Sequence, residues 1–572
     1  MMFGLPRSKS DPLADRKSAE RWLATFPSSD PLALHAQLID ALAQTAQQAA
    51  RRTPARLEAV LACDTGTLKM RKALSAQYLQ HASRSSKIEQ QLWSALFELT
   101  QAFLVAYAAF ARDVGDYTQN GRWKGLAPQL LCQQVVHLGL DARIRLYRYE
   151  QWIPAKWAEL HGLFTLACAR QVERIPIPRG RDGITTTIEQ EYVQVLVLQL
   201  MNSGNLTARH LEWIANELDE WCAPLRLTLE PASVNSFYVD LGSREGLRRR
   251  SPAPLEGRVL FLDTRSLHSV LMQNVLVLDQ KIRAQPLSDK TPRRSEQLSL
   301  LNKIAAQVDP EFKPFARRGE RTAADGTVDA IVGFTRIAGY LREEESNPLP
   351  QVDLGNSFDD TMDIAVFGRM RNQRDRQIET SRRRLAQYAT AGGPWEVKDV
   401  SQTGFRLVAP MSDAHAVTLG TMAAIRPHGQ PLWTLGIVRR MKRITSDRAE
   451  IGLQVIATTI VGVELIDQRK SVEDDYSVDG EAITINGRRF PALYLALRKR
   501  DADTPVRSLV LPASEYQPMR RFKLSTSKST YPVRFGRLIE QQPDWVWTAV
   551  EPLDVGSSDV GGSNTVFGDK NV

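Results

Sequence analysis

The chain has 572 residues, of which 43% are hydrophobic, enough for several domains with cores of their own. The excess of 74 lysines and arginines over 65 aspartates and glutamates favours anionic partners, but it is modest and by itself excludes no functional class of protein. Four widely spaced cysteines exclude a disulfide framework and a Cys-x-x-Cys metal site, and the absence of a run of eighteen apolar residues argues against a membrane span, so a cytoplasmic protein is expected.

Helical periodicity dominates the first part of the chain. Residues 1–29 are polar and are expected to form a flexible N-terminus, and residues 30–225 are expected to form a helical domain. Apolar residues recur at helical spacing over five turns between residues 92 and 110, which marks a long buried stripe. Asn205 is predicted to cap a later helix. Stacked antiparallel helices are the simplest packing for such stripes.

The pattern changes at residue 226. Residues 226–308 are expected to form a small α/β element, or a continuation of the helical domain with a sheet attached. A helix is predicted over residues 267–282, and a polar linker is predicted over residues 284–296. The predicted strands are short apolar runs at residues 227–229, 237–241 and 259–262.

An arginine pair and a polar turn stand out in the next region. Arg317 and Arg321 form an R-x-x-x-R pair, and the alternating strand of residues 328–332 follows them. Residues 395–408 form a predicted strand, turn and strand, and the turn has the pattern D-x-S-x-x-G. Two further strands, residues 432–438 and 450–456, suggest a small antiparallel barrel.

These motifs together resemble the PilZ family. The last of these motifs is the segment Ile-Gly-Leu-Gln-Val at residues 451–455, and the resemblance as a whole covers residues 315–465. It implies a six-stranded antiparallel β-barrel, at residues 309–468 of this chain, that binds the bacterial second messenger cyclic di-GMP. About eighty residues separate the arginine pair from the turn, so residues 341–393 are predicted to be an insertion, with a polar loop at its start and a helical stretch after it.

The resemblance also implies a ligand site. Arginine's planar fork matches guanine edges and phosphate oxygens, an aspartate can accept from guanine N–H groups, and a hydroxyl with glycine-turn amides suits phosphate. A mobile arginine arm that orders on binding would give a signal that neighbouring domains could read. The candidate ligand-binding residues are Arg317, Arg318, Arg321, Asp399, Ser401 and Gly404.

The remainder of the chain is expected to be β-rich. Residues 472–553 are predicted to form a C-terminal β-rich domain, with a hairpin turn at residues 485–488. The tail, residues 554–572, is rich in glycine, serine and asparagine and is expected to be disordered. The expected fold class is therefore multidomain α+β: a helical domain, a small α/β element, a PilZ-like barrel with a helical insertion, and a C-terminal β-rich domain.

Catalytic signatures are missing from the sequence. No phosphate-binding loop, dinucleotide fingerprint, serine-hydrolase elbow or His-Glu-x-x-His motif occurs, so we expect neither an enzyme nor a bound cofactor or metal. Three arginine clusters, at residues 248–250, 293–294 and 382–384, are interpreted as exposed surface. They lack the interleaved aromatics of a nucleic-acid-binding surface, so a nucleic-acid partner is not expected.

The sequence therefore favours a cyclic di-GMP receptor that relays ligand binding to an unidentified protein partner through its helical region. One alternative is a degenerate PilZ scaffold that binds protein but no nucleotide. Another is a sequence-independent nucleic-acid binder, whose affinity would fall steeply with salt. If the arginine pair is a chance match, Arg371, Arg374 and Arg376 are the next candidates.

Overall fold

A computed structural model places most of the chain in two compact units. The first unit comprises Met1–Arg317 with Arg440–Thr445, and the second comprises Arg318–Arg439 with Ser446–Val572. Helices come first, and two six-stranded β-barrels follow, so the expected multidomain α+β fold class is confirmed. The structure describes residues 11–26, 31–48, 52–81, 86–113, 121–179, 184–202, 204–233, 236–250, 257–284, 292–311, 321–346, 394–411, 417–427, 430, 432–467, 488–497, 506–526 and 529–553.

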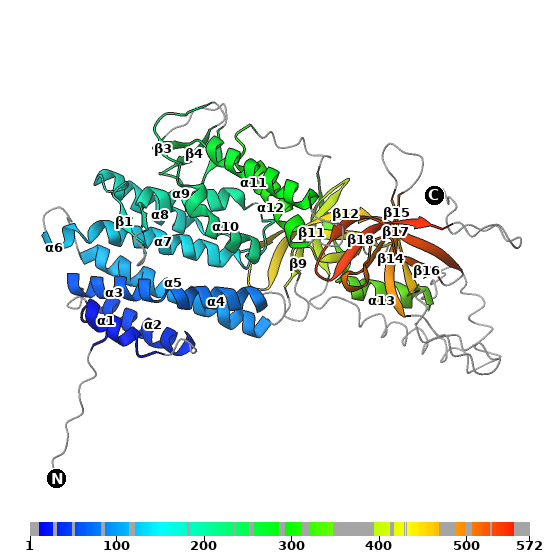
Figure 1. Cartoon of the computed structure of the whole chain (residues 1–572), viewed down its shortest axis with the longest axis horizontal. Helices are drawn as coiled ribbons and strands as arrows, with labels where there is room; N and C mark the ends of the chain where they lie inside the picture. The colour runs from blue at the N-terminus through cyan, green and yellow to red at the C-terminus, as the bar shows by residue number, and fades with distance from the viewer. Residues whose placement is uncertain are drawn as a thin grey trace, which may run out of the picture. The chain divides into compact units, whose positions relative to one another are not determined.

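The first unit is built mainly from helices that lie roughly alongside one another (Figure 1). Thr53 and Thr187 cap two of them, each accepting a hydrogen bond from the backbone N–H three residues later. The helices are α1 (Arg16–Leu23), α2 (Pro31–Gln47), α3 (Pro54–Gly66), α4 (Leu68–His81), α5 (Ser86–Asp113), α6 (Gly121–Lys124), α7 (Ala127–Leu146), α8 (Pro154–Ala169), α9 (Ile188–Met201), α10 (Ala208–Trp221), α11 (Arg265–Arg283) and α12 (Pro292–Val308).

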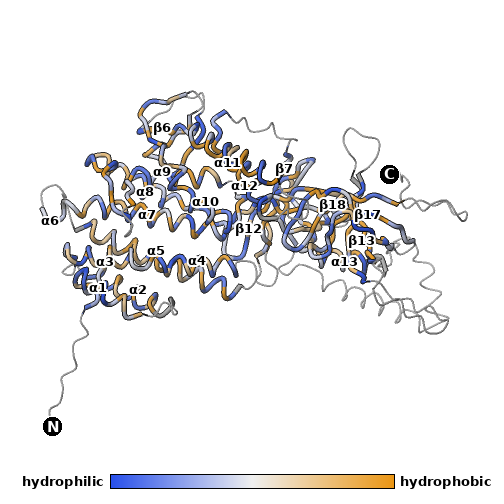
Figure 2. Tube along the Cα trace, in the orientation of Figure 1, coloured by the Kyte–Doolittle hydropathy of each residue, from blue (hydrophilic) through white to orange (hydrophobic). Residues whose placement is uncertain are grey.

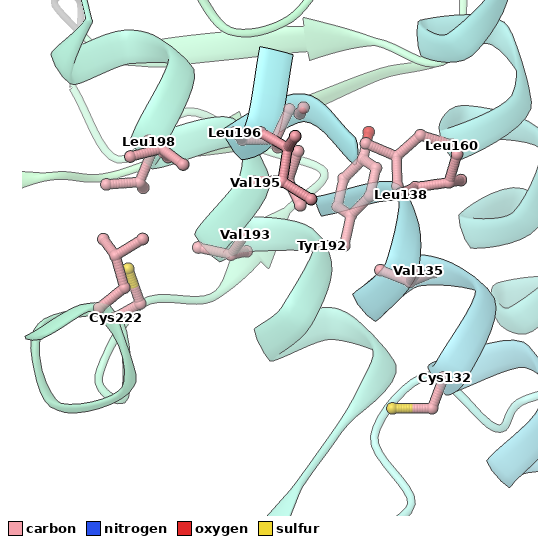
Figure 3. Close-up of a cluster of buried hydrophobic side chains, with 14 of the residues drawn as sticks. Cys132, Val135, Leu138, Leu160, Tyr192, Val193, Val195, Leu196, Leu198 and Cys222 are labelled. Atoms are coloured by element: carbon pink, nitrogen blue, oxygen red, sulfur yellow. The ribbon is translucent and has the colours of Figure 1, made fainter. Parts of the chain in front are cut away.

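One continuous hydrophobic core holds the first unit together. It extends from Leu13 to Val308, so the helices and the small sheet share it. Figure 3 shows α7, α8 and α9 contributing side chains to this core, among them Leu138, Leu160 and Tyr192. The strands are β1 (Ile177–Pro178) with β2 (Thr185–Thr186), and β3 (Leu227–Thr228), β4 (Phe237–Asp240), β5 (Arg248–Arg249) and β6 (Val259–Leu262) in the order β3-β6-β4-β5.

Helix α5 is long and contains an extended apolar segment. By length and composition alone, its segment Lys87–Arg112 is long and apolar enough to span a membrane, but the same is true of core helices in folded proteins. It packs against α2, α4 and α7, and its residues Leu99, Phe103 and Phe110 are fully buried. Figure 2 shows hydrophobic and hydrophilic residues interspersed along the helices of this unit.

Several local predictions in the first unit are wrong. Thr207, not Asn205, caps α10, because its hydroxyl accepts from the His210 N–H while the His210 ring accepts from the Thr207 N–H. Helix α12 begins at Pro292, inside the predicted linker of residues 284–296. In the arginine cluster of residues 248–250, Arg248 and Arg250 are exposed as expected, whereas Arg249 is half-buried and its guanidinium donates hydrogen bonds to two backbone carbonyl groups.

A buried carboxylate lies at the centre of a polar network in this core. Asp64 accepts a hydrogen bond from the Tyr107 hydroxyl at 2.8 Å, and it pairs with Arg71 at 2.5 Å and with His137 Nε2 at 2.8 Å. Burial on its own raises the pKa of Asp64, but His137 and Arg71 outweigh burial and hold that pKa well below its usual range. The carboxylate is therefore charged in the folded state at neutral pH.

The second unit contains the predicted barrel. Its strands are β7 (Thr322–Val332), β8 (Trp395–Ser401), β9 (Gly404–Pro410), β10 (Met422–Pro427), β11 (Thr434–Arg443) and β12 (Arg448–Ala457), closed in the order β10-β11-β12-β9-β8-β7. Buried and exposed residues alternate along these strands, as expected for strands with one face in a core. In β12, for example, Ile451 and Leu453 are buried while Gln454 is exposed. Strand β7 pairs with both β8 and β10, which closes the barrel across the long gap in sequence.

The C-terminal strands form a second closed barrel. They are β13 (Ile460–Asp467), β14 (Arg489–Leu497), β15 (Val506–Pro512), β16 (Arg521–Ser525), β17 (Thr530–Gln541) and β18 (Trp545–Pro552), with a 3-10 turn at Ala513–Glu515. Their order around the barrel is β13-β14-β15-β18-β17-β16. The predicted hairpin turn of residues 485–488 lies, except for Arg488, outside the described residues, as does the tail after residue 553.

Helix α13 (Phe334–Ser346) follows β7 directly and packs against both barrels. The prediction of a polar loop beginning at Arg342 is wrong, because the helix continues to Ser346. Glu344 accepts a hydrogen bond from the Tyr340 hydroxyl of the same helix at 3.1 Å and one from Arg426 of β10 at 3.2 Å, and the second bond ties the end of the helix to the first barrel. The rest of the predicted insertion, residues 347–393, lies outside the described residues.

We predict that replacing Asp64 with asparagine destabilises the first unit in a pH-dependent way. At pH 7 the substitution removes the buried negative charge that Arg71 pairs with and that His137 Nε2 contacts, which should lower the free energy of unfolding by about 3–5 kcal/mol. A carboxyl whose pKa is lowered by folding stabilises the protein above its unfolded pKa, and this stabilisation is lost as the pH falls. Denaturant titrations of parent and variant should therefore converge as the pH drops below about 4.

Asp279→Asn is the matched control for this prediction. It breaks an exposed ion pair with Arg283 on α11, 2.8 Å long, and should change stability little at any pH. A constant difference between the Asp64→Asn variant and the parent from pH 7 to pH 2 would show that the charge of Asp64 does not stabilise the fold.

Candidate ligand-binding site

Barrel closure brings the start of β7 next to the hairpin that joins β8 and β9. In the β7–β8 ladder, Ala323 lies opposite Asp399. Arg321, the last residue of the arginine arm, precedes Ala323 by two positions. In the β8–β9 ladder, Asp399 lies opposite Arg406, and Ser401 lies opposite Gly404. Register shifts in both ladders next to Asp399 mark β-bulges, which often re-aim a side chain at the rim of a barrel.

Two arginines converge on one carboxylate at this rim. Arg321 Nη1 lies 3.4 Å from Asp399 Oδ1, and Arg406 Nε lies 2.6 Å from Asp399 Oδ2. We call these three residues the arginine–aspartate site. Arg406 also approaches Glu450 of β12 at 3.9 Å. The predicted arm residue and the predicted turn residue are therefore in contact, although 77 residues separate them in the sequence.

Burial differs sharply within the arginine–aspartate site. The Asp399 side chain is 10% exposed, whereas those of Arg321 and Arg406 are 45% and 43% exposed. A nearly buried carboxylate needs compensating charge, and the two arginines supply it. The two half-exposed arginine side chains give the site one net positive charge.

The other two predicted turn residues lie in the hairpin itself. The Ser401 hydroxyl donates a hydrogen bond to the Gly404 carbonyl at 3.2 Å and so helps to close the turn. Gly404 lies against β12, and a Cβ atom there would come within 2.5 Å of the Leu453 carbonyl oxygen. Because β9 and β12 approach each other so closely here, position 404 requires a glycine, independently of any contact between its backbone and a ligand.

Two of the six predicted site residues have no described position. Arg317 and Arg318 lie outside the described residues, whereas Arg321, Asp399, Ser401 and Gly404 gather at one end of the first barrel. Sequence interpretation missed Arg406. The signal was present, because Arg406 follows Gly404 by two positions, and alternate residues of a strand share a face.

The arrangement is suited to an anion with planar, hydrogen-bonding groups. Each guanidinium carries five donors in a fixed fork, and the carboxylate orients both forks while retaining further lone pairs for a donor on a ligand. Among the described residues, no group of three or more His, Cys, Asp or Glu side chains could hold a metal ion. Binding of a phosphate or a guanine edge is the chemistry that this geometry supports.

A protein-family model matches the first part of the chain. Residues 17–232 match a family model described as the N-terminal domain of the cyclic-di-GMP receptor FimW. This region comprises α1 to α10 and β3, and it lies wholly before the barrels. No curated protein matches the chain. The matched region is under half of the chain, and it is a different part from the one that carries the arginine–aspartate site.

We predict that Gly404→Ala destabilises the second unit through the contact with Leu453. The added methyl group cannot be accommodated without moving a backbone carbonyl, so the loss should be about 1–3 kcal/mol, as for other overpacked sites. Gly326→Ala in β7 is the matched control, because a Cβ atom at that glycine meets nothing within 4 Å. Thermal unfolding of both variants tests this, and equal melting temperatures would contradict the steric explanation.

Proposed function

We propose that this protein is a cyclic di-GMP receptor and that its ligand binds at the arginine–aspartate site of the first barrel. One observation carries the proposal: Arg321 of the R-x-x-x-R arm contacts Asp399 of the D-x-S-x-x-G hairpin, at 3.4 Å, in a closed six-stranded barrel. The match of residues 17–232 to a domain of a cyclic di-GMP receptor supports it independently, because that match lies in the other part of the chain.

The chemistry of the ligand fits the groups at this site. Cyclic di-GMP offers two phosphates and two guanines, and an arginine fork can bind either a phosphate or the O6 and N7 atoms of guanine through two parallel hydrogen bonds. Arg321 and Arg406 each have more than a third of the side chain exposed, so both can reach a ligand without leaving Asp399 uncompensated. Asp399 can accept from a guanine N–H, as the PilZ-type assignment requires.

The proposed receptor works without catalysis. Binding at Arg321 would act on the start of β7, and β7 leads through Gly333, with φ of +92°, directly into α13. Because α13 packs on both barrels, a change at the start of β7 has a physical route into the rest of the second unit. We assign the helical region to a protein partner that receives the signal, in keeping with its large share of the chain.

The first test is a calorimetric titration of the whole chain with cyclic di-GMP. Arg321→Ala should weaken binding about 10- to 100-fold, the loss expected for one charge-assisted hydrogen bond. Arg321→Lys should recover little of it, because lysine keeps the charge but loses the planar fork. A Lys variant that binds like the parent would reduce the contact to diffuse charge attraction.

Arg448→Ala is the matched control for this titration. Arg448 is 46% exposed, like Arg321, and it also pairs with a carboxylate of β8, Glu396, but away from the arginine–aspartate site. Its loss should leave the affinity unchanged. A parent protein that does not bind cyclic di-GMP would favour the scaffold alternative, and binding to any nucleic acid with a steep salt dependence would favour the nucleic-acid alternative.

A further inference from the structure

The two barrels of the second unit have the same strand connectivity. Numbered by their order in the chain, strands one to six of the first barrel are β7 to β12, and those of the second are β13 to β18. In both, the order around the barrel is one, two, three, six, five, four, and strand four closes on strand one. Each strand of the first barrel therefore has a counterpart in the second.

The strand register identifies the counterparts of the arginine–aspartate site. In the β8–β9 ladder, Asp399 and Arg406 form the third pair from the connection between the strands. The third described pair of the β14–β15 ladder is Leu495 with Ser508. The carboxylate and its arginine are thus replaced by a leucine and a serine, both fully buried.

The arginine arm also has no counterpart. Arg321 precedes β7 at the end of a long connection from α12, whereas only Thr458 and Thr459 separate β12 from β13. Two residues cannot supply an R-x-x-x-R arm. Leu495 lies opposite Ile460 as Asp399 lies opposite Ala323, so Thr458 holds the position of Arg321, and it is exposed and uncharged.

The buried counterparts face out of the second barrel rather than into it. Along β14, Phe490 and Ala492 belong to the cluster inside the barrel, while Leu493 and Leu495 belong to a different cluster. The latter cluster joins them to Val510 and Trp545 of the same barrel, to α13, and to residues of the first barrel that include Met422 and Leu435. The face that corresponds to the candidate site is therefore covered by α13 and the first barrel.

We propose that this face of the C-terminal barrel is a packing surface that seats α13 against the first barrel, and that the chain consequently has a single ligand-binding barrel. The second part of this proposal rests on the proposed function, whereas the first part does not. The same fold thus serves two roles within one unit: the first barrel presents charged groups at its rim, and the second presents Leu493, Leu495 and Val510 at the corresponding face.

The packing role is tested without any ligand. Leu495→Asp places a carboxylate where the first barrel has one, but in an apolar contact without arginines, so the melting temperature of the second unit should fall by roughly 10 °C. Hydrogen exchange in α13 should rise at the same time. Leu538→Asp, at a leucine of β17 that is 43% exposed, is the matched control and should change neither measurement.

Leu495→Ala serves if the charged variant does not fold. It leaves a cavity instead of a charge, so it should give a smaller loss of stability with the same increase in α13 exchange. Unchanged exchange in α13 in both Leu495 variants would overturn the packing role, because that helix is the element that the surface is proposed to hold.

The single-site part is tested by titrating the parent and Arg321→Ala with cyclic di-GMP. All saturable binding should weaken together in the variant. A component that keeps the parent's affinity would show a second site away from Arg321 and overturn this part. If the parent does not bind at all, the proposed function fails, while the α13 measurements still decide the packing role.

Discussion

Closure of the first barrel by β7 is the constraint on which the second unit depends. Strand β7 pairs with β8 on one side and β10 on the other, although residues 333–394 separate it from β8. Bringing such distant segments together costs loop entropy, which grows only slowly with length and which the burial of Val328, Ile331 and Trp395 offsets. Because β7 closes the barrel, Arg321 meets Asp399 and α13 starts beside the barrel wall. The candidate site and the contact between the barrels both follow from this one pairing.

Much of the fold could be predicted from local patterns, and their limits have physical causes. Alternation of buried and exposed residues predicted β12 and the core of β7, and apolar runs predicted strands within both barrels, because a half-buried strand imposes a period of two. The same pattern does not say which strands are neighbours, so the shared connectivity of the two barrels was not predicted. The charged end of α13 was mistaken for a loop. Its buried residues, Ile337 and Ala338, precede the charged turn, and a contact with Arg426 holds that turn in place.

The candidate site was predicted in part for the same reason. Residue types suited to a phosphate or a guanine pointed to Arg321 and Asp399, but only the ladder register brings Arg406 opposite Asp399. Gly404 was interpreted as a ligand contact, and the structure adds a second reason for the glycine, because β12 lies too close for a side chain. Residues 17–232, which match the cyclic di-GMP receptor family, contain no motif that we connected with a nucleotide from the sequence. Packing in the hydrophobic core explains the apolar stripes of the helices in this region.

The two-residue link between β12 and β13 also has a consequence during synthesis of the chain. The first barrel and α13 are complete once Ala457 has emerged from the ribosome, but the surface that covers them extends to Trp545. At a translation rate of about 5–20 residues per second, the apolar side of α13 stays uncovered for roughly 4–18 s. During that interval the nascent protein exposes the surface that the finished protein buries, and a chaperone or another nascent chain can bind it before the second barrel folds.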